Sequence, residues 1–157
     1  MRPSVYIETT IPSYLTAWSS RDLIIAGHQQ ITKEWWTTRQ SHFSMYVSEL
    51  VIQECKGGDP LAIKDRMEAI KGISILKVTK EAEVIAGSLL IKKIIPKKAF
   101  ADAIHIAVAA ENECDYLMTW NCRHIANAEI YFHVRELLSS EGFQCPIICT
   151  PTELMGE

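Results

Sequence analysis

Short hydrophobic runs alternate with longer segments of helical periodicity along this chain. Five strands are predicted, over residues 5–7, 43–47, 73–78, 115–119 and 146–150. Helices are predicted over residues 21–39, 61–70, 81–93, 100–113 and 129–140, with shorter ones starting near Ile11 and Ser48 and a last helical turn at 152–155. Strands that alternate with helices indicate βαβ units and a mainly parallel sheet covered on both faces.

Particular residues mark where these elements begin and end. Thr10 is expected to cap the helix that begins at Ile11 and Pro12, because threonine is common at the N-cap and proline is tolerated in the first turn. Ser48 is expected to cap the following helix. The sequence Gly-Gly-Asp-Pro at 57–60 predicts a break before the next one.

Length and composition fit one domain that spans all 157 residues. The formal net charge of −3 means that any nucleic-acid-binding surface must be local. Five cysteines without C-x-x-C spacing argue against a disulfide framework or a zinc ribbon and favour free thiols in a reducing compartment. With no signal peptide and no apolar run of about 18 to 20 residues, we expect a cytoplasmic protein with no membrane association.

Four polar positions stand out against this hydrophobic pattern: Glu8, Glu54, Asp102 and Asn121. Three of them follow predicted strands, and the carboxyl ends of parallel strands line the crevice in which α/β proteins bind ligands. Singly, Glu8 is also explained as a strand-end acid, Glu54 as part of a polar helix face and Asn121 as a turn or cap residue. Their shared position relative to the sheet favours a site.

Asp102 is the hardest of the four to explain by structure alone. It lies near the start of the most apolar helix, where an unpaired carboxylate is costly. Helix amides or a nearby lysine could satisfy it, and the helix dipole favours a negative charge there; a metal ligand is the interpretation we favour. His105, one turn later on the same side, could be a general base, although a packed core histidine explains it better.

Oxygen-rich side chains at these positions predict a site for a hard cation, Mg²⁺ or Mn²⁺. Glu8, Glu54 and Asp102 would be the carboxylate ligands, and Asn121 would supply a neutral oxygen or hold a water molecule. A cation of this kind activates a bound water and offsets charge on a phosphodiester. Soft metals are disfavoured because no Cys/His cluster has ligand spacing.

Four segments containing these residues resemble the PIN domain of the bacterial VapC-like type. They read YIETT at 6–10, SELVIQE at 48–54, ADAIHIA at 101–107 and DYLMTWN at 115–121, in the order and spacing of that family. The resemblance covers about residues 5–125 and leaves the C-terminal helix and short strand outside the shared motif. It implies a three-layer α/β/α sandwich with a mainly parallel central sheet.

The resemblance also implies an activity: PIN domains are metal-dependent nucleases, and VapC-like members are commonly RNA-cleaving toxins that an antitoxin silences. It therefore implies an RNA substrate, an antitoxin partner, a homodimer and a catalytic set of Glu8, Glu54, Asp102 and Asn121. This chain departs from the family at two of these positions, since the first acid is usually Asp and the last is often Asp. Three carboxylates and one amide favour a single well-held cation.

Further residues are expected to support this site by their positions. Thr9 or Thr10 could orient Glu8 or a water molecule, and Thr119 could hydrogen-bond Asp102 or a phosphate. The supporting set is Thr9, Thr10, Ser48 and Thr119, and the residues expected to contact RNA are Lys97, Lys98, Arg123 and His124.

Two other functions remain open from the sequence. A degenerate PIN domain that binds RNA or a protein without cleaving is favoured by the departures at Glu8 and Asn121. A metal phosphatase or phosphotransferase is disfavoured, because the chain lacks a P-loop and a D-x-D nucleophile motif.

Overall fold

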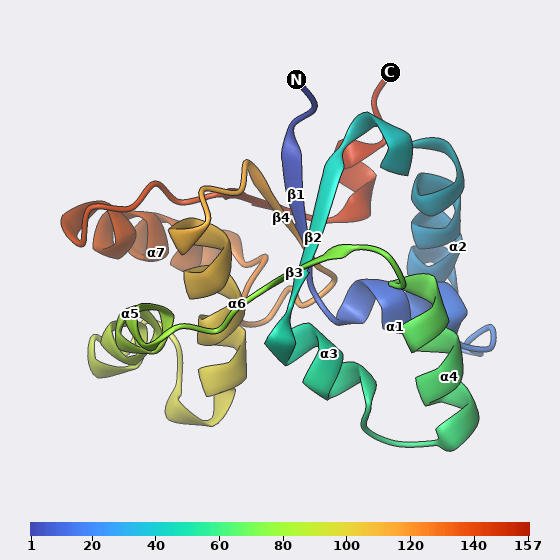
Figure 1. Ribbon diagram of the computed structural model, residues 1–157, viewed down its shortest axis with the longest axis horizontal. Helices are drawn as coiled ribbons and strands as arrows, with labels where there is room; N and C mark the ends of the chain where they lie inside the picture. Colours follow the sequence, from blue (N-terminus) through green and yellow to red (C-terminus); the bar gives the residue numbers. More distant parts are fainter.

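The computed structural model describes residues 1–157 and contains a five-stranded parallel sheet with helices on both sides (Figure 1). The strands are β1 (Ser4–Ile7), β2 (Ser44–Ser48), β3 (Ser74–Leu76), β4 (Tyr116–Met118) and β5 (Ile147–Cys149). Their order is β3-β2-β1-β4-β5, and every neighbouring pair is parallel. The chain runs outward from β1 to β3 and then returns to β4 beside β1, so the carboxyl ends of β1 and β4 lie at the point where a ligand crevice is expected.

Seven α-helices and three short 3₁₀ helices connect the strands. They are α1 (Thr10–Thr16), α2 (Leu23–Thr38), α3 (Glu49–Cys55), α4 (Pro60–Ala69), α5 (Lys80–Ile91), α6 (Phe100–Glu111) and α7 (Ala128–Ser140), with 3₁₀ turns at Gln40–His42, Lys97–Ala99 and Pro151–Leu154. In Figure 1, α5, α6 and α7 cover one face of the sheet, and α1, α2 and α4 cover the other. The α/β class and the three layers predicted from the sequence are confirmed.

The core forms where the apolar strand β1 meets the apolar helix α6. Val5, Tyr6 and Ile7 of β1 are fully buried, as expected for a central strand covered on both faces. In α6, all eight residues from Ala103 to Ala110 are buried. A helix that is hydrophobic on nearly every side has no polar face to present to solvent, so the composition of α6 correctly predicts that it is buried. Asp102 therefore lies one residue before this buried run.

The two predicted helix caps have different outcomes. Ser48 caps α3 as predicted, since its Oγ accepts a hydrogen bond from the Val51 amide at 3.3 Å. The cap predicted at Thr10 is wrong: α1 begins at Thr10, and Thr9 precedes it without a side-chain cap bond. The Thr10 hydroxyl instead donates to the Glu8 carboxylate at 2.6 Å, a charge-assisted bond that is stronger than a neutral cap.

None of the helices combines the length and the hydrophobicity that a bilayer-spanning segment requires.

Candidate functional site

Two carboxylates meet at the carboxyl edge of the sheet. Glu8 directly follows β1, and Glu54 lies on α3, the helix that leaves the end of β2. One carboxylate oxygen of each lies within 4.8 Å of the other and of a ring nitrogen of His105. His105 comes from α6, so three separate segments of the chain contribute to one polar cluster.

Glu8 is held in place through only one of its oxygens. Its Oε1 accepts hydrogen bonds from the Thr119 hydroxyl at 2.5 Å, the Thr10 hydroxyl at 2.6 Å and the Thr10 amide at 3.2 Å. Oε2 accepts none. Glu8 is only 4% exposed. However, Oε2 is not fully buried, because Nε of Arg39 is the only fully buried side-chain polar atom without a partner. Oε2 of Glu8 therefore keeps a small exposed surface and has no protein donor.

Glu54 is held in a similar way. Its Oε1 accepts hydrogen bonds from the Thr9 hydroxyl at 2.6 Å and from Nε2 of His105 at 2.7 Å, and Oε2 has no protein donor. Burial raises the pKa of this carboxyl, but the hydrogen bonds from His105 and Thr9 oppose this effect, and the pKa lies below its usual value. The carboxylate is ionised at neutral pH and keeps one oxygen for a ligand.

His105 continues this network into the core. Its Nδ1 lies 2.7 Å from the Tyr6 hydroxyl, which lies 2.7 Å from Oγ of Ser48. All three residues are fully buried. Burial strongly raises the pKa of Tyr6, so its phenol remains protonated. The sequence favoured a packed, hydrogen-bonded histidine at this position, which is how His105 is placed, but it gave no signal for Tyr6 because a tyrosine in an apolar strand reads as core.

Asp102 has a partner that the sequence did not indicate. Its Oδ2 lies 3.1 Å from Nδ1 of His124, and the two side chains are 21% and 20% exposed. Neither helix amides nor a lysine supplies the contact. Asp102 is not part of the group formed by Glu8, Glu54 and His105, so the structure brings together two of the three predicted carboxylate ligands and places the third beside an imidazole.

Asn121 uses its side-chain oxygen locally. Its Oδ1 accepts hydrogen bonds from the backbone amides of Arg123 at 3.3 Å and His124 at 3.0 Å. The backbone amide of Asn121 donates to the Thr119 hydroxyl at 2.9 Å. This is a turn conformation in which asparagine is common. The oxygen that was expected to face a cation or a water molecule instead shapes the loop after β4.

The supporting threonines contact the two glutamates. Thr10 and Thr119 donate to Glu8, and Thr9 donates to Glu54. The contact predicted between Thr119 and Asp102 is absent, because the Thr119 hydroxyl points across the sheet from β4 to the end of β1.

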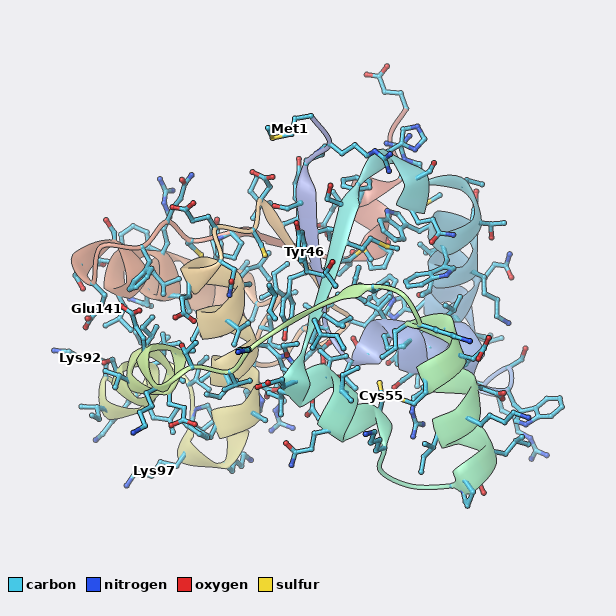
Figure 2. All side chains as sticks on the ribbon, in the orientation of Figure 1. Met1, Tyr46, Cys55, Lys92, Lys97 and Glu141 are labelled. Carbon is cyan, nitrogen blue, oxygen red and sulfur yellow. The ribbon has the colours of Figure 1, made fainter.

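The basic residues expected to contact RNA lie on the surface. Lys97 and Lys98 are exposed on the 3₁₀ turn before α6, and Lys97 extends outward from the molecule in Figure 2. Arg123 is exposed and His124 is partly buried in the loop after Asn121.

An aromatic stack anchors the loop that follows β4. The Trp120 ring lies nearly parallel to His28 with centroids 4.0 Å apart, and Tyr14 stacks beside them, 6.2 Å from Trp120. The Trp120 indole donates to the Thr32 hydroxyl at 2.7 Å, and its backbone amide donates to the Thr10 hydroxyl at 2.8 Å. Trp120 is 8% exposed, so its role here is to anchor the loop to α1 and α2.

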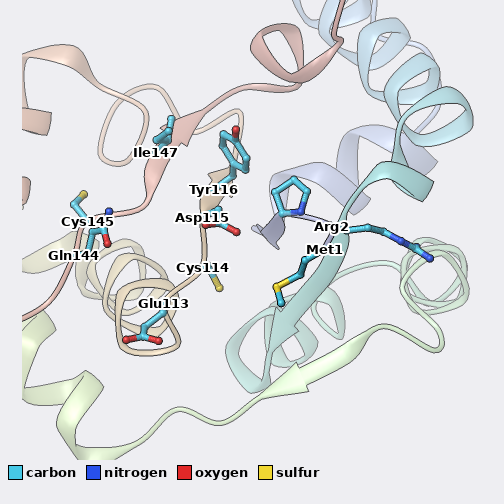
Figure 3. Close-up of a pocket in the computed structure, with 10 residues that line it drawn as sticks. Met1, Arg2, Glu113, Cys114, Asp115, Tyr116, Gln144, Cys145 and Ile147 are labelled. Atoms are coloured by element: carbon cyan, nitrogen blue, oxygen red, sulfur yellow. The ribbon is translucent and has the colours of Figure 1, made fainter.

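A cavity of about 570 Å³ lies away from these residues (Figure 3). It is lined by the N-terminus and by the segments that lead into β4 and β5, with Arg2, Asp115 and Cys145 among its residues. These are the amino ends of parallel strands, so the cavity lies at the sheet edge opposite to the glutamates.

Comparison with known proteins relates the chain to VapC toxins by structure. No protein-family model and no curated protein matches the sequence. Mycobacterium tuberculosis VapC20, described as a toxin that cleaves the sarcin-ricin loop, superposes with a TM-score of 0.54 at 16% identity over 73% of this chain and 87% of that one. VapBC2 of Rickettsia felis, bound to a DNA fragment from its promoter, gives 0.58 at 13% identity over 93% and 97%. This chain has the PIN fold of VapC toxins, as the resemblance of its motifs predicted.

Proposed function

We propose that this protein is a divalent-metal-dependent endoribonuclease, the toxin of a type II toxin–antitoxin pair. The observation that carries the proposal is the paired arrangement of Glu8 and Glu54. Each carboxylate is tied through Oε1 and leaves Oε2 free at the carboxyl edge of a VapC-like sheet. Two carboxylate oxygens that lack protein donors, held by neighbouring elements, suit a hard cation with oxygen ligands.

Glu8 and Glu54 would hold Mg²⁺ or Mn²⁺, and Asp102 would join them directly or through water. When bound, such a cation makes a water molecule more acidic and offsets the negative charge that develops on the phosphodiester. The chain's own residues prepare for this. Thr10 and Thr119 fix Glu8, while Thr9 and His105 fix Glu54, so little side-chain entropy remains to be lost when a ligand binds.

The Asp102–His124 pair would contribute at the substrate side. His124 lies on the loop after β4, next to exposed Arg123, and its imidazole is held by the Asp102 carboxylate. A basic loop beside the glutamates would bind the phosphate backbone of RNA, with Lys97 and Lys98 as further contacts. Because the net charge is −3, this local basic surface would have to provide the electrostatic attraction for RNA.

The structural likeness to the VapBC2 complex supports an antitoxin partner for this chain. We propose that the protein forms a homodimer and is held inactive by a cognate antitoxin. Co-purification of the two products of a shared operon, followed by release of ribonuclease activity when the second protein is proteolysed, would test this proposal.

The direct test is cleavage of mixed single-stranded RNA with Mg²⁺ or Mn²⁺ by the wild type, Glu8→Gln and Asp102→Asn. Both variants should lose cleavage by at least about 100-fold, as expected when a charged group that acts in the transition state is neutralised. Asp65→Asn is a matched control, since Asp65 is an exposed acid on α4. This variant should cleave RNA like the wild type. Unchanged activity in Asp102→Asn would remove Asp102 from the site, and metal-independent cleavage would refute the mechanism.

A second candidate function is RNA or protein binding without cleavage. It is favoured by Asn121, whose side-chain oxygen is used within its own loop, and by the His124 partner of Asp102. Calorimetric titration with Mn²⁺ separates the two: measurable binding that Glu8→Gln weakens supports the nuclease, and no binding supports the non-cleaving domain.

A further inference from the structure

We propose that the buried chain Ser48–Tyr6–His105 is a positioning relay for Glu54, in which His105 orients the carboxylate as a hydrogen-bond donor and is not itself a metal ligand. The proposal rests on the proposed metal site and adds to it a set of residues from the core. Three polar side chains with no exposed surface, contributed by the end of β2, by β1 and by α6, lead to a single atom, Oε1 of Glu54.

The direction of the relay follows from counting protons. A carboxylate only accepts, so the bond between Glu54 and Nε2 of His105 requires a proton on Nε2. With Nδ1 unprotonated, the Tyr6 hydroxyl can donate to it, and Ser48 can donate to the Tyr6 oxygen. Oγ of Ser48 accepts in turn from the Val51 amide. Every proton in this arrangement has an acceptor.

The opposite direction leaves a proton without a partner. If Nδ1 carried a proton and donated to Tyr6, the Tyr6 hydroxyl would donate to Ser48, and the Ser48 proton would have no acceptor in a site with no exposed surface. A buried unsatisfied donor is disfavoured. The hydrogen-bond pattern therefore selects the neutral tautomer with the proton on Nε2.

This tautomer decides what His105 can do. Its Nε2 lone pair is absent and its Nδ1 lone pair faces Tyr6, so neither nitrogen is free to coordinate a cation. Glutamate has a long, flexible side chain, and Glu54 is 34% exposed, so it would otherwise sample several rotamers. The donor at Nε2 and the Thr9 hydroxyl together hold Oε1 and direct Oε2 to the site. Loss of a hydrogen bond that orients a metal ligand commonly lowers the metal affinity by about 10- to 100-fold.

The test begins with Tyr6→Phe, which removes one oxygen from the relay and keeps the ring that packs in the core. Calorimetric titration with Mn²⁺ should give about tenfold weaker binding than the wild type. Tyr46→Phe is the matched control, because Tyr46 is the partner of Tyr6 in the β1–β2 register and its hydroxyl makes no hydrogen bond within the protein; its affinity should equal that of the wild type. Trp35→Phe removes a buried hydrogen bond to the Leu154 carbonyl, which is not part of the relay, and controls for loss of stability alone.

The second measurement needs no metal. Nitrogen-15 NMR of the metal-free protein should show His105 with a protonated Nε2 and an unprotonated Nδ1, and Tyr6→Phe should shift the Nδ1 resonance. A proton on Nδ1 would overturn the relay. Equal Mn²⁺ affinity in the wild type and Tyr6→Phe, or an equal loss in Trp35→Phe, would also overturn it. A wild type that does not bind Mn²⁺ would refute the proposed function, and the tautomer would still decide whether the relay exists.

Discussion

The hydroxyl of Thr119 offers the sharpest test of how Glu8 is held. Thr119 is fully buried, and its Oγ1 donates to Oε1 of Glu8 at 2.5 Å and accepts from the Asn121 amide at 2.9 Å. Thr119→Val keeps the branched shape and removes only this hydroxyl. Thr119 has no exposed surface and valine fills the same space, so no water can take the place of the hydroxyl and both contacts are lost.

The expected cost follows from the two bonds. A hydrogen bond to a charged group contributes about 1.5 to 3 kcal/mol, and an ordinary one contributes about 1 kcal/mol. Glu8 keeps its two bonds from Thr10, so it is not left without partners. The free energy of unfolding should therefore fall by roughly 2 to 4 kcal/mol, a large part of the 5 to 15 kcal/mol typical of a domain.

Urea unfolding followed by tryptophan fluorescence would measure this loss. Thr38→Val is the control, since its hydroxyl is exposed and bonds to the Glu34 carbonyl within its own helix, and it should change stability by less than about 0.5 kcal/mol. A loss below about 1 kcal/mol in Thr119→Val would refute the reasoning, because it would mean that the bond from this hydroxyl to the Glu8 carboxylate contributes little to stability.

Three further predictions concern the glutamates and the thiols. Because the pKa of Glu54 is lowered, its contribution to the free energy of unfolding is present above pH 4.5 and is lost as the pH falls through the pKa of the folded state. In urea unfolding, Glu54→Gln should make the free energy of unfolding depend less on pH in this acidic range. Glu8→Asp restores the residue usual in PIN domains, but the shorter side chain withdraws from Thr10 and Thr119, so calorimetry should show weaker Mn²⁺ binding; tighter binding would contradict this. Maleimide labelling followed by mass spectrometry should modify exposed Cys122 first. Half-buried Cys145, whose pKa burial raises to about 11, should react more slowly than Cys122. The three buried thiols should react only on unfolding, because burial raises the pKa to about 11 for Cys55 and Cys114 and to about 12 for Cys149.

Hydrophobic periodicity was sufficient to predict the elements of this fold. Runs such as 5–7 and 106–110 are apolar without interruption, and such runs are buried whatever their neighbours are. The predicted strand over 73–78 was too long, since only Ser74–Leu76 pairs. It is an edge strand that contacts β2 alone, and alternation in sequence does not show where the neighbouring strand ends.

The polar contacts of the site were less predictable. Glu8 and Glu54 were expected to meet because both follow strands, and a shared sheet edge brings them together. The contact between Tyr6 and His105 joins residues 99 positions apart across a strand and a helix, and no local pattern marks it. The same is true of the Asp102–His124 pair, because its geometry depends on how the loop after β4 packs against the start of α6.

The two departures from the PIN pattern have structural counterparts that bear on how many cations the proposed site would hold. Glu8 uses its additional methylene to reach back to the Thr10 amide and hydroxyl, which an aspartate at the end of β1 would reach less well. Asn121 commits its oxygen to the amides of its own loop, and the charge of Asp102 faces His124. Negative charge without a protein partner is thus concentrated on the free oxygens of Glu8 and Glu54. To hold two divalent cations close together, a site needs more carboxylate charge than these two oxygens supply, so we propose that the site would hold one cation.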